Sequence, residues 1–194
     1  VAGVRALALL LTSGQGRALE DWVWGNWVPA IVLCSFNDDS ESTMEALLAE
    51  AARRVPAMLL DATERQMVGE NGWSALESVV PLLGPSQLPW LLRLVDDQSA
   101  DVRSSTLAAT RIAVLDPDTA LGRMSGWLND HEPLNRTSAL LCAMISAIGD
   151  RAWEAAYPTL LDDDELARSV IQSLSSREQA YSLSEAHTVE LWEL

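Results

Sequence analysis

Val102-Arg103-Ser104-Ser105-Thr106-Leu107 is the stretch that decides the fold, because two later stretches repeat its pattern. These are Asn135-Arg136-Thr137-Ser138-Ala139-Leu140 and Ala167-Arg168-Ser169-Val170-Ile171, and the three arginines lie 33 and then 32 residues apart. Val4-Arg5-Ala6-Leu7 lies 98 residues before Arg103, close to three such periods. A fixed period of this length is typical of a helical repeat array, in which each unit buries its apolar face against its neighbours.

Each period has room for two helices, which we term A and B, with B beginning at the arginine signature. Apolar residues recur at helical spacings, and no stretch alternates apolar and polar residues as a half-buried strand would. The predicted B helices span residues 2–12, 41–54, 72–83, 100–115, 133–148 and 164–175. The predicted A helices span 18–36, 55–67, 86–96, 118–129 and 151–161, and a further helix starts at Ser184. The sequence therefore predicts an all-α chain, an α-solenoid of about five antiparallel helix pairs forming a single domain over residues 1–194.

The charge of the chain narrows the classes of partner. It carries 28 acidic residues against 13 basic ones, all of them arginine, for a net charge of −15. Nucleic-acid binding draws much of its affinity from basic residues that displace counterions, so we expect no nucleic-acid partner. No apolar run reaches the roughly 18 residues that a membrane span needs, so we expect no membrane partner.

The two cysteines, Cys34 and Cys142, lie in apolar runs three repeats apart. Helices that stack about 8–10 Å apart place such residues beyond the ~7 Å Cα separation of a disulfide. We therefore expect buried free thiols and a cytoplasmic location. The sequence starts at Val1 and stops in mid-pattern at Leu194 without a polar capping repeat, so we expect a piece of a larger protein.

Acidic residues recur in the turns that lead from A to B. Asp97, Asp130 and Asp163 are 33 residues apart both times. An aspartate at this position can accept backbone N–H bonds at the start of helix B, where the helix dipole favours negative charge. We predict that B-helix arginines bridge to these turns and form a structural ladder through the stack. Its basic members are Arg5, Arg103, Arg136 and Arg168.

The best-formed unit is Leu88-Pro89-Trp90-Leu91-Leu92-Arg93-Leu94-Val95-Asp96-Asp97, followed by Ala100-Asp101-Val102-Arg103. It resembles the HEAT-repeat family, in particular the short bacterial HEAT-like repeats, over residues 86–175. The proline of its A helix recurs at Pro29, Pro56 and Pro158. The resemblance implies that the B helices line a concave surface, and that the chain is a non-enzymatic scaffold for protein binding.

Residues that carry chemistry are few. His131 and His187 belong to no His-x-x-x-His or Cys-x-x-Cys spacing, which disfavours a zinc site. Asp162-Asp163-Asp164 lacks the spacing of a calcium-binding EF-hand loop. We therefore expect no enzymatic activity, and no catalytic, cofactor-binding or metal-binding residues.

Tryptophan is the remaining unusual feature, with eight in the chain and three at Trp22, Trp24 and Trp27. On a helix, Trp24 and Trp27 share a face and Trp22 points elsewhere, so some indole surface should be exposed or meet another domain. Packing against a neighbouring repeat or domain and contact with a partner both remain open. These tryptophans, with Arg111 on the concave side, are the candidate protein-binding residues.

The function that we expect is a binding or scaffolding module for a protein partner or another domain of the same polypeptide. One alternative is a sensor or regulatory arm of a larger bacterial multidomain protein, such as an NTPase. Another is an enzyme, because HEAT-like folds include DNA glycosylases and relatives of phycobilin lyases. The net charge of −15 disfavours the glycosylase.

Overall fold

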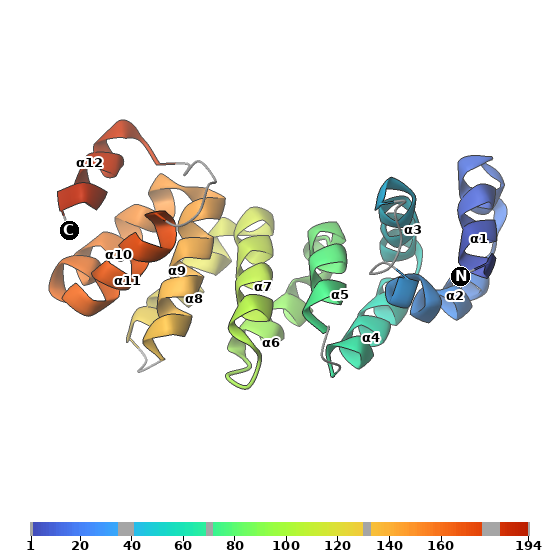
Figure 1. Ribbon diagram of the computed structural model, residues 1–194, viewed down its shortest axis with the longest axis horizontal. Helices are drawn as coiled ribbons and strands as arrows, with labels where there is room; N and C mark the ends of the chain where they lie inside the picture. The colour runs from blue at the N-terminus through green and yellow to red at the C-terminus, as the bar shows by residue number, and fades with distance from the viewer. Residues whose placement is uncertain (1, 35–40, 69–71, 130–132, 176–182, 194) are drawn as a thin grey trace. The chain divides into compact units, whose positions relative to one another are not determined.

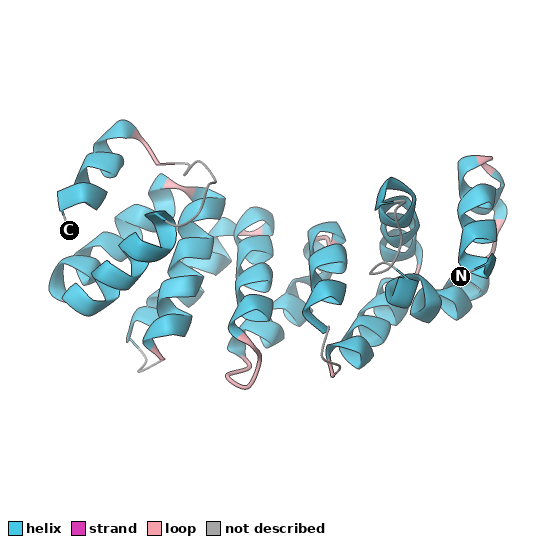
Figure 2. Ribbon diagram, in the orientation of Figure 1, coloured by secondary structure: helices cyan, strands magenta, loops and turns pink. Residues whose placement is uncertain are grey.

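The computed structural model describes residues 2–34, 41–68, 72–129, 133–175 and 183–193. Regular structure in these ranges is helical throughout and includes no strand (Figure 2). The predicted all-α class is therefore confirmed. No helix within the same ranges combines the length and the apolar character needed to cross a bilayer.

The α-helices alternate between the two predicted kinds along the chain (Figure 1). The B helices are α1 (Ala2–Thr12), α3 (Glu41–Arg54), α5 (Gly72–Val79), α7 (Val102–Leu115), α9 (Leu134–Ile148) and α11 (Asp164–Ser175). The A helices are α2 (Asp21–Cys34), α4 (Pro56–Met67), α6 (Leu88–Asp96), α8 (Pro117–Asn129) and α10 (Asp150–Asp162). The further helix expected from Ser184 is α12 (Glu185–Glu193).

One predicted helix ends early. The segment expected to be helical to residue 83 is α-helical only to Val79 and continues as a 3₁₀ turn over Val80–Leu82. Pro81 explains the change, because proline has no N–H to donate to the carbonyl four residues earlier and its ring clashes with that carbonyl.

Short side chains fix several helix starts. Asp101 accepts a hydrogen bond from the Ser104 N–H at 3.0 Å and so caps α7. Asp116 accepts the Thr119 N–H at 3.1 Å, directly before the proline that opens α8. Gly149 alone separates α9 from α10, with φ at 55°, a conformation that glycine adopts without strain.

The chain divides into two compact units, residues 1–87 and 88–194. The prediction of a single domain over 1–194 stays a prediction. In the second unit, successive helices from α6 to α11 contact one another, as do α7 with α9, α9 with α11 and α8 with α10. Helix α9 is central to these contacts, and Leu140 to Ile145 are all buried in it.

In the first unit, α2 and α4 pack together, and α3 contacts α1, α2, α4 and α5. The core of this unit includes Trp24, Val28 and Ile31 of α2, which are fully buried. Full burial of side chains of this size stabilises by about 1.5–3 kcal/mol each relative to exposure. The predicted A-helix prolines are accommodated within or at the start of helices: Pro29 inside α2, Pro56 as the first residue of α4 and Pro158 inside α10.

Candidate protein-interaction surface

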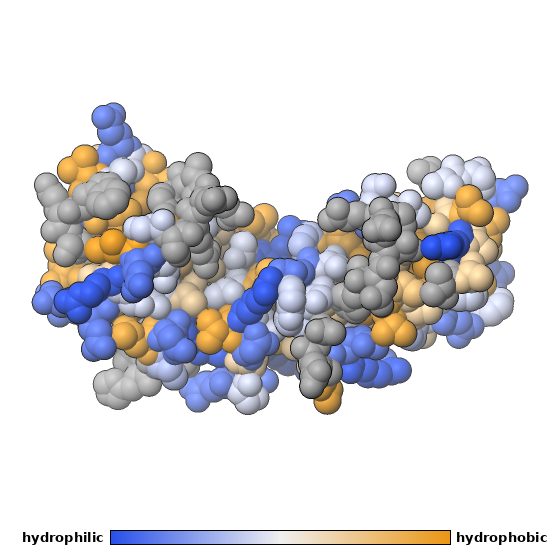
Figure 3. Space-filling view, in the orientation of Figure 1, coloured by the Kyte–Doolittle hydropathy of each residue, from blue (hydrophilic) through white to orange (hydrophobic). Residues whose placement is uncertain are grey.

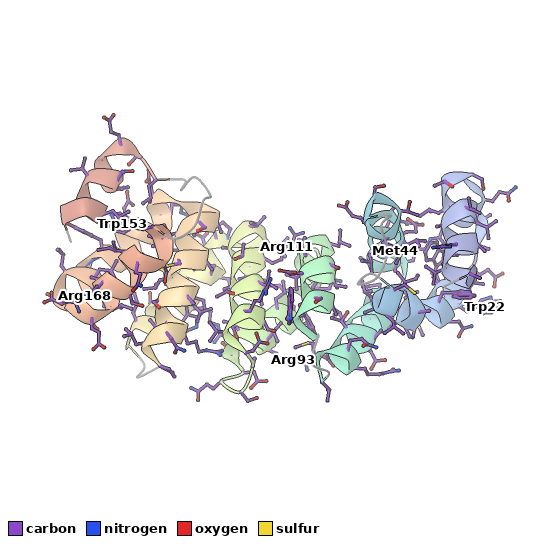
Figure 4. The ribbon with its side chains drawn as sticks, viewed as in Figure 1. Trp22, Met44, Arg93, Arg111, Trp153 and Arg168 are labelled. Carbon is purple, nitrogen blue, oxygen red and sulfur yellow. The ribbon has the colours of Figure 1, made fainter. Side chains whose placement is uncertain are left out.

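The three closely spaced tryptophans of α2 lie in three environments. Trp22 is 65% exposed, Trp24 is completely buried and Trp27 is half-buried. Successive residues turn by about 100° around a helix, which carries Trp24 and Trp27 toward the core and Trp22 away from it. The structure thus places the expected exposed indole at Trp22, which projects from α2 (Figure 4).

Trp27 has a structural partner in α1. A methyl group added at Gly3 would lie 2.1 Å from Cη2 of the Trp27 ring, so the ring packs directly on the backbone of α1. Such an approach requires glycine. The structure therefore assigns Trp27 to the packing of α1 on α2.

Trp22 begins a row of exposed residues along α2. Asn26, Pro29 and Leu33 follow at spacings of four, three and four residues, which places all four on one face of the helix. Leu33 is 52% exposed. We term Trp22, Asn26, Pro29 and Leu33 the α2 stripe. Because α2 is apolar on its core side as well, its solvent side offers fewer polar groups to water than a helix of this kind normally does, with Asp21 and Asn26 as its exposed polar residues.

Met58 of α4 extends the α2 stripe. It is about half exposed, and its Sδ lies 2.4 Å from the position that a Cβ on Gly25 would occupy. Gly25 is one turn from both Trp22 and Pro29, so the Met58 thioether lies beside the stripe. Thioethers adapt to irregular apolar partners, which suits Met58 to a contact surface.

Hydrophobic and hydrophilic side chains lie side by side on the visible face of this unit (Figure 3).

Arg54 anchors the start of α2. Its Nη1 donates to the Leu19 carbonyl at 2.7 Å and lies 3.3 Å from Oδ1 of Asp21, and its Nε donates to Glu50 at 2.6 Å. The guanidinium also stands 5.8 Å from the ring centroid of Trp24. These contacts tie α3 to the first turn of α2, so Trp22 projects from a fixed backbone.

Glu50 remains ionised in this anchor. The hydrogen bonds from Arg53 lower its pKa most, partial burial raises it, and the hydrogen bond from Arg54 lowers it further, to about 2. The anchoring contact between Glu50 and Arg54 is therefore charged on both sides at neutral pH.

Arg136 of the predicted ladder contacts an acidic turn. It is only 4% exposed, and its guanidinium donates to the carbonyls of Val95 at 2.8 Å, Asp97 at 3.0 Å and Ala100 at 3.1 Å. The partner atoms are backbone carbonyls one repeat earlier. The Asp97 carboxylate instead accepts two hydrogen bonds from Ser99, which lower its pKa.

The other ladder residues are placed differently. Asp163 accepts the N–H groups of Glu165 at 3.1 Å and Leu166 at 3.0 Å, and so caps α11. Asp130 lies outside the described residues. The remaining predicted arginines are exposed: Arg5, Arg103 and Arg168. The structure therefore describes the bridge between an arginine and an acidic turn at Arg136.

A second set of contacts, which we did not predict, joins A-helix first turns to residues one period later. Asp118 accepts a hydrogen bond from Arg151 at 2.6 Å, and Asp150 accepts the Ser184 N–H at 2.8 Å. The Asp21 contact of Arg54 spans 33 residues, as the Asp118 contact does, and the Asp150 contact spans 34. The sequence feature that could have predicted these contacts is an aspartate at or near the start of each of these A helices.

His187 of α12 sits among carboxylates of two helices. Its Nδ1 lies 2.8 Å from Oδ1 of Asp150, and its Nε2 lies 3.9 Å from Glu154 and 4.0 Å from Glu190. Trp153, fully buried in α10, donates its indole N–H to Glu190 at 2.8 Å. These contacts attach α12 to α10.

Asp150 and His187 shift each other's pKa. The hydrogen bond with Asp150 raises the pKa of His187, burial opposes that effect, and the nearby carboxylates add to it. The Ser184 N–H, followed by His187, lowers the pKa of Asp150. Both shifts favour the charged pair.

The remaining candidates are distributed over separate elements. Arg111 is half-buried on α7. Cys34 is a half-buried free thiol, and Cys142 is a buried one whose Sγ donates to the Val170 carbonyl at 3.7 Å. Within the ranges that the structure covers, no group of three or more histidine, cysteine, aspartate or glutamate side chains is arranged to hold a metal ion.

Comparison of the chain with protein-family models, with curated proteins and with solved structures finds no match in any of the three.

Proposed function

We propose that the chain is an α-solenoid of HEAT-like repeats that binds a protein partner or another domain of the same polypeptide. In support, helices one repeat apart contact one another within each unit. These pairs are α1 with α3, α2 with α4, α3 with α5, α7 with α9, α8 with α10 and α9 with α11. Stacked helical hairpins are expected to pack in this manner. The proposal assigns the chain no catalytic role.

The observation that carries the binding role is the α2 stripe. A row of three apolar residues and one asparagine, with a 65%-exposed tryptophan at one end, lies on a helix whose first turn is held by Arg54. Tryptophan is enriched among residues that dominate binding energy, and a fixed backbone reduces the entropy lost on binding. We therefore assign the α2 stripe, with Met58, as the contact surface.

Site-specific photocrosslinking in the native host tests this assignment. Benzoylphenylalanine in place of Trp22 should give one dominant crosslinked species, identified by mass spectrometry. The same probe in place of Leu161, a 56%-exposed leucine on α10, serves as the control and should not give that species. Identical products from both positions would show that the α2 stripe has no special role.

Solution scattering tests the proposed stack separately. A compact globule of this length has a radius of gyration of about 16 Å, whereas an extended stack of hairpins has a larger one. A measured value near that of the globule would exclude the solenoid and leave the binding assignment to the crosslinking experiment.

A further inference from the structure

The α2 stripe has the dimensions of a helix-binding site. Trp22 and Leu33 are 11 residues apart, which corresponds to about 17 Å, or three helical turns. An amphipathic helix that buries an apolar face presents anchors at spacings of three and four residues over the same distance. Met58 adds an apolar side chain from α4 beside the stripe.

Carboxylates border this apolar row. Glu20 accepts the indole N–H of Trp22 at 2.6 Å, and the neighbouring Asp21 is largely exposed. On α4, Asp61 follows Met58 by one turn and is also exposed. The exposed guanidinium on that helix, Arg65, is already paired with Asp61, and Arg54 is mostly buried in the α2 anchor.

This arrangement determines which partners are favoured by charge. A net charge of −15 attracts basic partners at long range, and the carboxylates beside the stripe continue that attraction at contact. The same carboxylates repel phosphate backbones and anionic bilayers, although an exposed tryptophan alone would suit a membrane interface.

We propose that the occupant of the α2 stripe is an amphipathic helix of a protein partner, with apolar residues on one face and lysine or arginine along its borders. The inference rests on the proposed binding function and specifies the chemistry of the partner. The partner's apolar face covers Trp22, Pro29 and Leu33, and its basic residues lie near Glu20 and Asp21.

Three synthetic peptides test the proposal with the full chain. They share one leucine face, are about 18 residues long so that each can form a helix, and differ only in having Lys, Gln or Glu along the borders. Fluorescence anisotropy should show the Lys peptide binding about tenfold or more tightly than the Gln peptide, and the Glu peptide binding least. Raising the salt from about 0.05 M to about 0.5 M should remove most of that difference.

Matched variants locate the binding. Trp22→Ser and Leu33→Ser should each weaken binding of the Lys peptide about tenfold, because each removes an apolar anchor. Leu161→Ser changes a leucine of similar exposure in the second unit and should leave the dissociation constant within about twofold. Equal loss in all three variants, or no loss in the first two, would overturn the proposal.

The results also separate this inference from the proposed function. Equal binding of the Lys and Gln peptides, or binding of none while Trp22 still crosslinks to one partner, overturns the basic-helix inference and leaves the binding function standing. Binding of none with no crosslink at Trp22 overturns both. Trp22-dependent binding to phosphatidylglycerol vesicles, with no peptide bound, would identify a membrane surface as the occupant instead.

Discussion

The guanidinium of Arg136 donates a 2.8 Å hydrogen bond to the carbonyl oxygen of Val95, 41 residues earlier in the chain. The same side chain also binds the carbonyls of Asp97 and Ala100, so one buried cation satisfies three acceptors of the preceding turn. A buried arginine with three carbonyl acceptors fixes the position of one repeat on the next.

Replacing Arg136 with alanine should therefore lower the free energy of unfolding by about 2–4 kcal/mol, since it removes three hydrogen bonds of a buried cation, one of them to the carbonyl of the buried Val95. Lysine should restore part of the loss, because it keeps the charge but lacks the planar fork. Urea denaturation measures the effect. Arg168→Ala is the control: this arginine is exposed, and the change should stay within about 0.5 kcal/mol. Equal effects at both positions would contradict the bridging role.

The contact between His187 and Asp150 should make α12 sensitive to pH. Because the folded state raises the pKa of His187 above 6.5, its stabilising effect is fully present below the unfolded value and is lost as pH rises through the folded one. At the acidic end, the effect is lost as pH falls through the lowered pKa of Asp150. Attachment of α12 should thus be tightest between these two values.

An NMR titration of the histidine Cε1–H resonances checks this expectation. His187 should titrate above 6.5, and Asp150→Asn should move its pKa downward. The indole N–H resonance of Trp153 should follow the same transition, since it is bonded to Glu190 of α12. His131→Ala should leave the transition unchanged. An unshifted His187 pKa in Asp150→Asn would contradict the pairing.

Three glycine substitutions should differ in sign or size. Gly3→Ala should lower the free energy of unfolding by about 1–3 kcal/mol, because the new methyl group meets the rigid ring of Trp27. Gly25→Ala should cost less, since the flexible end of Met58 can move aside. Gly126→Ala has open space in α8 and should stabilise by about 0.5–1 kcal/mol. Thermal or urea denaturation would show the order, and a destabilised Gly126→Ala would contradict it.

Substitutions at Trp22 and Trp24 should separate the effect on partner binding from the effect on the free energy of unfolding. Trp24→Ala should cost about 3–5 kcal/mol of unfolding free energy, whereas Trp22→Ala should stay within about 0.5 kcal/mol, because Trp22 is exposed. Trp24→Phe should cost less than Trp24→Ala, because it keeps an aromatic ring in the core and leaves a smaller cavity. Both changes remove an indole N–H that is buried with no acceptor among the described residues. Chemical denaturation of the three variants checks the order, and a large loss in Trp22→Ala would show that its role is structural.

The helices were predictable because the apolar spacing, the prolines and the capping aspartates point to the same boundaries. Asp116 with Pro117 marks the start of α8, and Gly149 marks the joint of α9 and α10. The 100° turn per residue also separated Trp22 from Trp24 and Trp27.

The atoms that long side chains contact were less predictable. The period indicated that Arg136 meets the acidic turn of its own or a neighbouring repeat. The choice of the preceding repeat, and of backbone carbonyls over a carboxylate, depends on how the helices pack and how deeply the guanidinium is buried. The pairing of His187 with Asp150 depends on the placement of α12 against α10, which no motif specifies. Likewise, exposure of Leu33 and Met58 follows from which faces of α2 and α4 pack together.

Gly149 stands alone between two helices of more than three turns each, and its carbonyl already accepts the N–H of Ala152 at 3.0 Å. A connection of one residue contains no slack. A force on the first turn of α10 is therefore passed directly to the last turn of α9.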